Sequence, residues 1–398
     1  MPDLERIGAL ERAYVQEVLD AEFRTSAGGA LTTRLERAFA ELVGVQYAVA
    51  FINGTATMHA ALAAAEVGPG DEVIVPPLTM ASTALAVLQA GAVPVFADVD
   101  AHTFNLDPAS VKQRLTPRTR AIIPVALYGL APELDALMQI AGEHGLFVLE
   151  DDAEAVLGAI GERRLGAIGH AASFSLQASK HLTSGEGGLI TTNDGELAER
   201  IRRFNSLGYA AIGARRSAIA AQDIQDPGYS RHVSFGFNYR LPELCAAVAL
   251  AQVQRADELV QRRIDVAHGF AQAVAGTQWL VPQHTPPGVR HTYWTYVLRL
   301  ADPGCSWQDF RRVFLHEGGD PFYGAWRLTY LEPLFAGGCP LRDPRYEGVY
   351  QEYAPGLCPV AEELQPRLIQ LKTNYWRQDE AERQAQALHA TIERIEGG

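Results

Sequence analysis

Residues 120–152, "RAIIPVALYGLAPELDALMQIAGEHGLFVLEDD", place two continuously apolar segments of strand length on either side of a helical pattern. The apolar segments cover 120–129 and 146–152, and the helical pattern covers 131–145. Strands that are apolar at consecutive positions and separated by helices are typical of a parallel sheet covered on both faces. The stretch therefore predicts a doubly wound α/β fold, in which ligands bind at the carboxyl ends of the strands.

The same alternation of apolar strands and helical patterns continues on both sides of this stretch. Strands are expected at 71–76, 92–100, 170–176 and 187–194, and helices are expected at 79–91 and 106–115. These segments extend the mainly parallel sheet over the first part of the chain.

The second part of the chain has a different pattern. A helical pattern of about 35 residues begins at Pro242 and is longer than an ordinary helix of a compact domain, so we expect it to bend and to link two domains. Beyond it, "TYWTYVLRL" (292–300) alternates like a half-exposed strand, and 307–319 and the last twenty-odd residues are helical patterns. We therefore expect a large domain over 1–255 and a smaller α+β domain over 256–398.

Composition and charge exclude several classes of protein. The 398 residues include 34 basic and 47 acidic ones, without a basic block, which disfavours nucleic-acid binding. No run of about 18 uncharged apolar residues is present, and the first twenty residues lack the pattern of a signal peptide. The four cysteines form no CxxC pair, so neither a zinc site nor a disulfide framework is indicated. We expect a cytoplasmic globular protein with no metal site and no membrane contact.

Two segments carry groups that could bind an anion. In "INGTATMHAAL" (52–62), Gly54 and two small residues begin a helical pattern, and free N–H groups at a helix N-terminus bind phosphate well. A turn with a Thr cap would explain the same residues. In "SFGFNYRLPELCAAVALAQ" (234–252), Asn238 and Arg240 precede the long helical pattern and could reach an anion, although a turn and cap are the alternative.

Three acidic residues follow the strand at 146–152. Asp151 and Asp152 end the apolar segment, and Glu154 lies just beyond it. A buried Asp could keep a pyridine nitrogen protonated, as a pyridoxal ring requires when it acts as an electron sink. A helix N-cap would also account for a carboxylate at this position.

The segment "SFSLQASKHLTSGEGG" (173–188) contains one lysine, Lys180, after a strand that carries Ser173 and Ser175. A lone lysine is most often a solvated surface charge. An amine in a desolvated site beside a cationic cofactor could instead form a Schiff base, because its pKa would be lowered there. The order of phosphate-binding helix start, strand-end acid and lysine in an α/β chain of this length favours the cofactor interpretation.

Four segments, "GTAT" at 54, "LEDDAEA" at 149, "SFSLQASKHLTSGEGG" at 173 and "GFNYRLPELCAAVALAQ" at 236, together resemble the DegT/DnrJ/EryC1/StrS family of sugar aminotransferases. The resemblance covers the chain from residue 28 to about residue 300. It implies the fold type I architecture of aspartate aminotransferase and pyridoxal 5'-phosphate (PLP) as cofactor. It also implies a homodimer whose active sites lie between the subunits.

The resemblance assigns roles in cofactor attachment. Lys180 falls on the family's Schiff-base lysine, which is the catalytic residue. Thr55 and Ala56 would bind the cofactor phosphate through their backbone N–H groups, and Ser175 would add its hydroxyl. Asn238 would reach the phosphate from the neighbouring subunit.

Further residues would contact the cofactor ring. The resemblance assigns Asp151 to the pyridine nitrogen, with Asp152 as the alternative because "EDDAEAVLGA" is one residue longer than the common family pattern. Glu154 would lie against the ring. Met80 stands where many members have Phe or Trp over the other face, and a thioether can also pack against an aromatic ring.

The activity that the resemblance implies is transamination from L-glutamate to a keto-sugar linked to a nucleotide. We consider the candidate substrate residues to be His181, Arg240, Tyr323 and Arg327. The last two belong to "PFYGAWRLTYLEPLF" (321–335), whose aromatic residues and arginine could form a wall of the substrate cleft. The alternative is that this segment belongs to the core of the smaller domain.

Three other functions stay open. Within the family, the chain could be a glutamine-dependent aminotransferase for a cyclitol such as an inosose, or an aminobenzoate synthase. A PLP or pyridoxamine phosphate sugar dehydratase has His in place of the lysine, and His181 would take that position if the alignment slipped by one residue. A non-catalytic protein of the same fold is disfavoured because the lysine, the acid and the phosphate-binding segment are all present.

Overall fold

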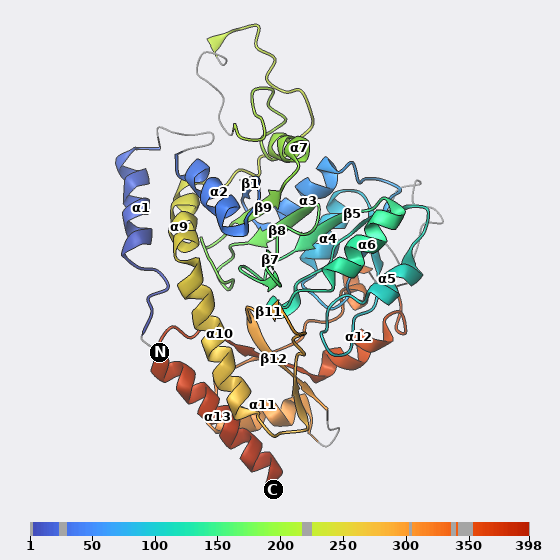
Figure 1. The fold of residues 1–398 in the computed structure, drawn as a ribbon, viewed down its shortest axis with the longest axis vertical. Coiled ribbons are helices and arrows are strands. Elements are labelled where there is room, and N and C mark those ends of the chain that lie inside the picture. Colours follow the sequence, from blue (N-terminus) through green and yellow to red (C-terminus); the bar gives the residue numbers. More distant parts are fainter. Residues whose placement is uncertain are drawn as a thin grey trace.

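A computed structural model of the chain describes residues 3–23, 30–216, 225–301, 305–335, 340 and 353–397. The strands of its largest sheet are β1 (Tyr47–Phe51), β2 (Glu72–Val75), β3 (Val93–Phe96), β4 (Thr119–Ile122), β5 (Phe147–Asp151), β8 (Ala171–Ser175) and β9 (Gly188–Thr192). Their order is β1-β9-β8-β5-β4-β2-β3 (Figure 1). Neighbours from β3 to β8 pair in parallel, whereas β9 is antiparallel to β1 and β8. The predicted mainly parallel sheet is confirmed.

The stretch at 120–152 folds as strand, helix and strand, with α6 (Leu134–His144) between β4 and β5. The first strand is shorter than predicted, because β4 ends at Ile122 and a 3₁₀ turn, η1 (Leu127–Gly129), follows. Pro124 has no N–H to donate to a strand ladder, which agrees with this early end.

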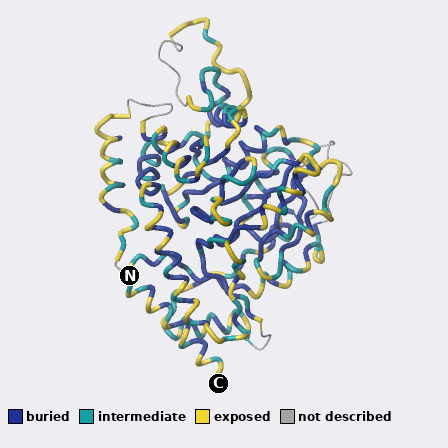
Figure 2. The backbone as a smooth tube through the Cα atoms, viewed as in Figure 1, coloured by how far each residue is buried: buried dark blue, intermediate teal, exposed yellow. Residues whose placement is uncertain are grey.

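Helices cover both faces of the large sheet. They are α1 (Ala9–Asp20), α2 (Ala30–Val43), α3 (Gly54–Ala64), α4 (Ser82–Gln89), α5 (Pro108–Arg114), α7 (Gly195–Asn205) and α9 (Glu243–Gln254) together with α6. Along β1, Val49 and Phe51 pack into the core under α3, α4 and α7, while Ala48 and Ala50 pack into the core under α2 and α9. This alternation explains why residues that point to either face of the strand are buried, and Figure 2 shows the buried residues concentrated around the sheet.

A second sheet is built after the long helical segment. It contains β10 (Leu280–Pro282), β12 (Thr295–Leu300), β13 (Tyr323–Gly324) and β14 (Leu368–Lys372) in the order β10-β12-β14-β13, all antiparallel. Beside it lie α10 (Ala256–Ala273), α11 (Trp307–His316) and α13 (Gln378–Glu396). The remaining short elements are β6 (Ala159–Ile160), β7 (Arg163–Arg164), β11 (Val289–Arg290), η2 (Thr329–Leu331), η3 (Pro333–Phe335), α12 (Pro359–Leu364) and η5 (Gln365–Arg367).

Two expectations for this part of the chain have different outcomes. The long helical pattern is interrupted at Arg255, where α9 ends and α10 begins, as predicted. The prediction that the strand within residues 292–300 is half-exposed was wrong, because five of the six residues of β12 are buried. Tyr296 and Leu298 pack toward α10 and α13, whereas Val297 packs into the core of the large sheet.

The division into domains at 255/256 stays a prediction. In its favour, α10 packs with the second sheet. However, Phe335, Tyr353 and Leu364 join the core of the first sheet, so the C-terminal part of the chain contributes to both cores.

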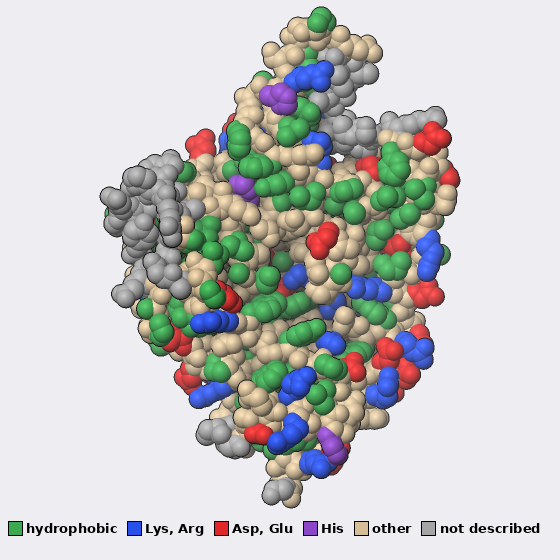
Figure 3. Space-filling view, turned by 180° about the vertical axis from the view of Figure 1, so that it is seen from behind, with side chains coloured by type: hydrophobic (Ala, Val, Ile, Leu, Met, Phe, Trp, Pro, Cys, Tyr) green, Lys and Arg blue, Asp and Glu red, His purple; other side chains and the backbone are tan. Residues whose placement is uncertain are grey.

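The surface and the helices agree with the sequence composition. On the face seen in Figure 3, basic side chains are interspersed with acidic and hydrophobic ones. Among the described segments, none of the helices has both the length and the apolar character that crossing a bilayer requires.

Candidate active site

A cavity of about 430 Å³ lies at the carboxyl ends of β5 and β8. Its walls come from the N-terminus of α3, the turn at 79–82, the end of β5, the segment 173–186 and two tryptophans, Trp294 and Trp326. The predicted cofactor residues that line it are Thr55, Met80, Asp151, Glu154, Ser175 and Lys180. The structure therefore brings together six residues that are spread over 126 positions of the sequence.

The N-terminus of α3 reaches the cavity because two glycines allow close packing. A Cβ on Gly54 would lie 3.2 Å from the Cβ of Ser175, and a Cβ on Gly188 would lie 2.6 Å from the backbone of Asn53. The side chain of Asn53 caps the helix and accepts a hydrogen bond from the Ala56 N–H at 2.8 Å. The first turn of α3 thus presents its positive end to the cavity beside the Ser175 hydroxyl.

Ala56 departs from its predicted role. It does not line the cavity, and its N–H group donates to Asn53 Oδ1 rather than pointing freely at a ligand. For Ala56 to bind a phosphate, the Asn53 side chain would have to release this hydrogen bond.

Asp151 ends β5 and is 3% exposed. Its Oδ2 accepts a hydrogen bond from the Thr83 hydroxyl at 2.8 Å, and its Oδ1 accepts one from the Ala153 N–H at 3.3 Å. Burial raises the pKa of the Asp151 carboxyl above its usual value. A buried carboxylate of this kind is stabilised by a ligand that brings a positive charge.

Asp152 occupies a different environment from Asp151. It is 1% exposed, does not line the cavity and shares a side-chain hydrogen bond with Glu150. Burial and the negative charge of Glu150 raise the pKa of Asp152 well above its usual value. Of the two candidates for the pyridine partner, the structure places only Asp151 at the cavity.

Lys180 lies in the cavity with its side chain 13% exposed. Its Nζ is 3.1 Å from Glu154 Oε1 and 4.3 Å from the centroid of the Trp294 ring. The other carboxylate oxygen of Glu154 accepts the Tyr128 N–H at 2.9 Å. The amine is therefore close to a carboxylate and to an aromatic face, and is shielded from bulk water.

His181 does not lie in the cavity, although it is adjacent to Lys180 in the sequence. It is completely buried, and its Nε2 donates to the carbonyl of Thr292 at 2.8 Å. Burial and the charge of Arg263 hold the pKa of His181 well below its usual value. His181 is buried and does not line the cavity, so the structure offers no support for the expectation that it contacts a substrate.

The other candidate substrate residues also lie outside the cavity lining. Arg240 is half-buried and its backbone pairs with Phe51, while Tyr323 and Arg327 are exposed. Asn238 is exposed and does not line this cavity. The segment 321–335 lines the cavity through Trp326, whereas neither Tyr323 nor Arg327 lines it.

Sequence reasoning did not assign a role to Trp294, and it included Trp326 only as one of the aromatic residues of the predicted wall at 321–335. Their rings are stacked with centroids 5.9 Å apart and an interplanar angle of 29°, and both line the cavity. The signal available in the sequence was the aromatic content of the segments 292–300 and 321–335, but neither segment is near the lysine along the chain.

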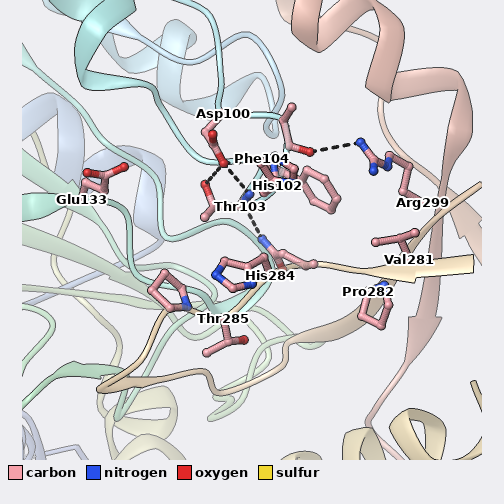
Figure 4. A pocket seen from close by; sticks show the side chains of 13 residues that line it. Asp100, His102, Thr103, Phe104, Glu133, Val281, Pro282, His284, Thr285 and Arg299 are labelled. Atoms are coloured by element: carbon pink, nitrogen blue, oxygen red, sulfur yellow. Dashed lines mark hydrogen bonds between the residues drawn. The ribbon is translucent and has the colours of Figure 1, made fainter. Parts of the chain in front are cut away.

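A larger cavity of about 810 Å³ lies between residues 100–104 and 281–286 (Figure 4). None of the predicted site residues lines it, and several of its polar groups bond within the chain. Asp100 accepts hydrogen bonds from the loop that it begins, and the His284 N–H donates to the His102 carbonyl. In the described part of the chain, no three His, Cys, Asp or Glu side chains gather in a way that could hold a metal ion.

Comparison with known proteins gives concordant matches. The family described as the DegT/DnrJ/EryC1/StrS aminotransferase family matches residues 5–374. The GDP-perosamine synthase of Caulobacter vibrioides is 40% identical over 314 residues, which cover 76% of this chain and 79% of that protein.

Solved structures have the same fold over nearly the full length. The aminotransferase from Psychrobacter cryohalolentis has a TM-score of 0.85 at 29% identity and covers 100% of this chain and 98% of its own. The 3-amino-5-hydroxybenzoic acid synthase has a TM-score of 0.82 at 29% identity and covers 99% of this chain and 98% of its own. These matches confirm the expected fold type I architecture. The chain belongs to the DegT/DnrJ/EryC1/StrS family of PLP-dependent aminotransferases.

Proposed function

We propose that the protein transfers an amino group from L-glutamate to a keto-sugar linked to a nucleotide, with PLP as its cofactor. The observation that carries this proposal is the meeting of Lys180, Asp151 and the N-terminus of α3 in one cavity. The name of the relative from Caulobacter vibrioides, a GDP-perosamine synthase, supports a nucleotide-linked sugar as the acceptor.

The residues of the cavity fit the groups of PLP. The helix N-terminus and the Ser175 hydroxyl suit a phosphate, because they offer N–H and O–H donors and a positive dipole end. Asp151 is a buried acid with a raised pKa, which a protonated pyridine nitrogen would stabilise as a carboxylate. When bound, PLP supplies an electron sink for the carbanion that deprotonation of the amino donor produces.

The residues of the chain then divide the work of proton transfer and orientation. Lys180 would hold the cofactor covalently through its amine, and the same amine, when free, would move a proton between the α-carbon of the donor and C4' of the cofactor. Glu154 holds this amine at 3.1 Å. Because the amine is largely shielded from water, the transferred proton has few competing acceptors.

Two other acceptors have to be distinguished from a nucleotide-linked keto-sugar, and a comparison favours one of them. The likeness to 3-amino-5-hydroxybenzoic acid synthase keeps an aminobenzoate function open, and a glutamine-dependent cyclitol aminotransferase has the same motif requirements. An assay that pairs L-glutamate and L-glutamine with a nucleotide keto-sugar and an inosose distinguishes them. The proposal requires the fastest turnover with L-glutamate and the nucleotide keto-sugar.

The cytoplasmic location of the protein stays a prediction.

We expect the purified protein to be yellow and to lose its visible absorption band when L-glutamate is added. The colour arises from the conjugated link between PLP and Lys180, and glutamate breaks this link by converting the cofactor to its amine form. Absorption spectra recorded before and after the addition test the prediction. A protein that stays colourless after incubation with PLP would contradict the proposal, and the Lys180→Ala variant is the matched control.

We also propose that the active unit is a homodimer in which Asn238 completes the partner's site. Asn238 is exposed, and two large apolar side chains that precede it by a few residues in the chain are also exposed, Val233 at 54% and Phe235 at 76%. Exposed large apolar side chains are typical of a surface that another protein covers. A second copy of this chain fits the family in which the resemblance places Asn238 in the neighbouring active site.

The Asn238→Ala variant should weaken PLP binding about tenfold to a hundredfold, because a hydrogen bond to a charged group is lost. Mixing subunits tests where the residue acts. Inactive Lys180→Ala chains are combined with cofactor-free Asn238→Ala chains, and PLP is added at a limiting concentration. If Asn238 acts across the interface, one site of each mixed dimer has neither lesion, and activity rises above that of both parents. The absence of any recovery would contradict the shared site even if the protein is dimeric.

A further inference from the structure

We infer that Trp294 is a positioning residue for the amine of Lys180, a role that rests on the function proposed above for that lysine. The amine nitrogen lies 4.3 Å from the centroid of the Trp294 ring. A cation over the face of an indole is attracted by the electron density of the ring. The ring and the Glu154 carboxylate, 3.1 Å from the same nitrogen, together fix the position of the amine.

The backbone of one residue, Tyr128, connects these two contacts. Its N–H donates a hydrogen bond to Glu154 Oε2 at 2.9 Å, and its carbonyl accepts a hydrogen bond from the backbone N–H of Trp294 at 2.9 Å. Tyr128 is 1% exposed and has a φ of 63°, in the left-handed region that a residue with a side chain rarely adopts. Such a conformation persists only where the surrounding structure enforces it. The carboxylate and the aromatic ring are therefore held at a fixed separation.

A buried arginine connects the ring to the lysine itself. Arg263 is 1% exposed and donates to the carbonyls of Trp294, Ser179 and Lys180 at 2.8–2.9 Å. The indole Nε1 of Trp294 also donates to the Ser179 carbonyl at 3.0 Å. The Arg263 guanidinium thus bonds to the backbone of both Trp294 and the lysine segment, and the indole bonds directly to that segment. The ring and the lysine segment therefore have little freedom to move independently.

The charged groups around the amine explain why an aromatic ring is useful there. Glu154 binds the ammonium directly, and the negative charge of Asp151 also interacts with it, while Arg263 lies on the side of the lysine backbone. A free lysine side chain has four flexible carbons and would rotate toward water whenever its amine is not covalently bound. The ring restrains it without adding another charge to the site.

The composition of the chain permits a direct test. The protein contains three lysines, Lys112, Lys180 and Lys372, so acetylation by acetic anhydride can be followed at each lysine by peptide mass spectrometry. We expect Trp294→Leu to raise the acetylation rate of Lys180 about threefold to tenfold relative to Lys112, because the ring covers one side of the nitrogen and restrains it from the reagent. We expect Trp294→Phe to stay within about twofold of the unmodified protein, since it keeps an aromatic face.

Two controls separate the ring from other effects. Trp326→Leu removes the stacking partner of Trp294 without removing the contact with Lys180, and it should leave the rate unchanged. Lys372 pairs with Thr295 in the strand that begins beside Trp294, so an unchanged rate at Lys372 shows that this strand is intact. Equal increases in the Phe and Leu variants would assign the effect to the lost Nε1 hydrogen bond and overturn the inference. No increase in Trp294→Leu would also overturn it.

The full-length protein is labelled in two states so that the inference and the proposed function are tested separately. One sample is the purified protein after addition of L-glutamate, in which the proposed function requires a free lysine amine. The other sample is freed of cofactor and does not depend on transamination. If the expected ranking of variants appears only in the cofactor-free sample and Lys180 stays unlabelled with glutamate, the function fails and the inference stands. If glutamate exposes Lys180 equally in all variants and the cofactor-free rates are also equal, the inference fails and the function stands.

Discussion

The Lys180→Ala variant should lose turnover by about 10³-fold or more while it still binds PLP without a covalent link. Lys180 has two roles in the proposed reaction, since it anchors the cofactor and its amine carries the proton. Alanine removes both, whereas the phosphate-binding helix start, Ser175 and Asp151 remain in the cavity. Steady-state turnover of L-glutamate with a keto-sugar acceptor measures the loss, and equilibrium dialysis with PLP measures the retained binding.

The matched control is His181→Ala. His181 is buried, donates a hydrogen bond to the Thr292 carbonyl and does not line the cavity. Its loss should therefore affect stability more than turnover per folded molecule. If His181→Ala were inactive and Lys180→Ala turned over normally, the dehydratase-like alignment would replace the one that we favour. A Lys180→Ala protein that no longer binds PLP would instead show that the covalent link dominates cofactor affinity.

The parts of the site that could be predicted from the sequence lie close to strand ends. A buried parallel strand must be apolar at every position, so β5 and the carboxylate that ends it, Asp151, stand out in the linear pattern. The same reasoning places Ser175 at the end of β8 and Lys180 just beyond it, and a glycine-led helix start supplies Thr55. Because the carboxyl ends of these strands meet at one edge of the sheet, local patterns sufficed to assemble most of the cavity.

The parts that could not be predicted depend on contacts between distant segments. Trp294 reaches Lys180 only because β12 is sandwiched between two cores, whereas its alternating pattern indicated a half-exposed strand. His181 is buried among segments that are distant in the chain, since its Nε2 donates to the carbonyl of Thr292, 111 residues away, and burial together with the charge of Arg263 lowers its pKa. Ala56 is engaged by a side-chain cap that phosphate-binding patterns do not reveal. For Trp294 and His181 the deciding partner is distant in the sequence, whereas Asn53 is only three residues from Ala56 and its capping role depends on the local backbone geometry.

The Asp151→Asn variant should lower turnover about a hundredfold or more, because breaking a buried charge pair costs about 3 kcal/mol or more and each 1.4 kcal/mol corresponds to a factor of ten. The amide keeps the shape of the side chain and can still accept the Thr83 hydroxyl, but it cannot hold the pyridine nitrogen in its protonated form. Turnover at saturating PLP separates this loss from weaker cofactor binding.

Asp152→Asn is the matched control, because Asp152 is equally buried but bonds to Glu150 and does not line the cavity. We expect near-normal turnover from this variant. A greater loss in Asp152→Asn than in Asp151→Asn would transfer the role of pyridine partner to Asp152.

The stability of the cofactor-free protein shows whether Asp151→Asn acts through chemistry or through folding. Burial raises the pKa of Asp151, so the charged carboxylate opposes folding at pH values above its pKa in the unfolded chain, and this cost disappears as the pH falls below that value. The asparagine variant should therefore melt at the same or a higher temperature than the unmodified protein at neutral pH, and the difference should shrink in acid. A variant that is inactive and also less stable at neutral pH would indicate that Asp151 supports the fold, and its assignment to the pyridine nitrogen would lose its physical basis.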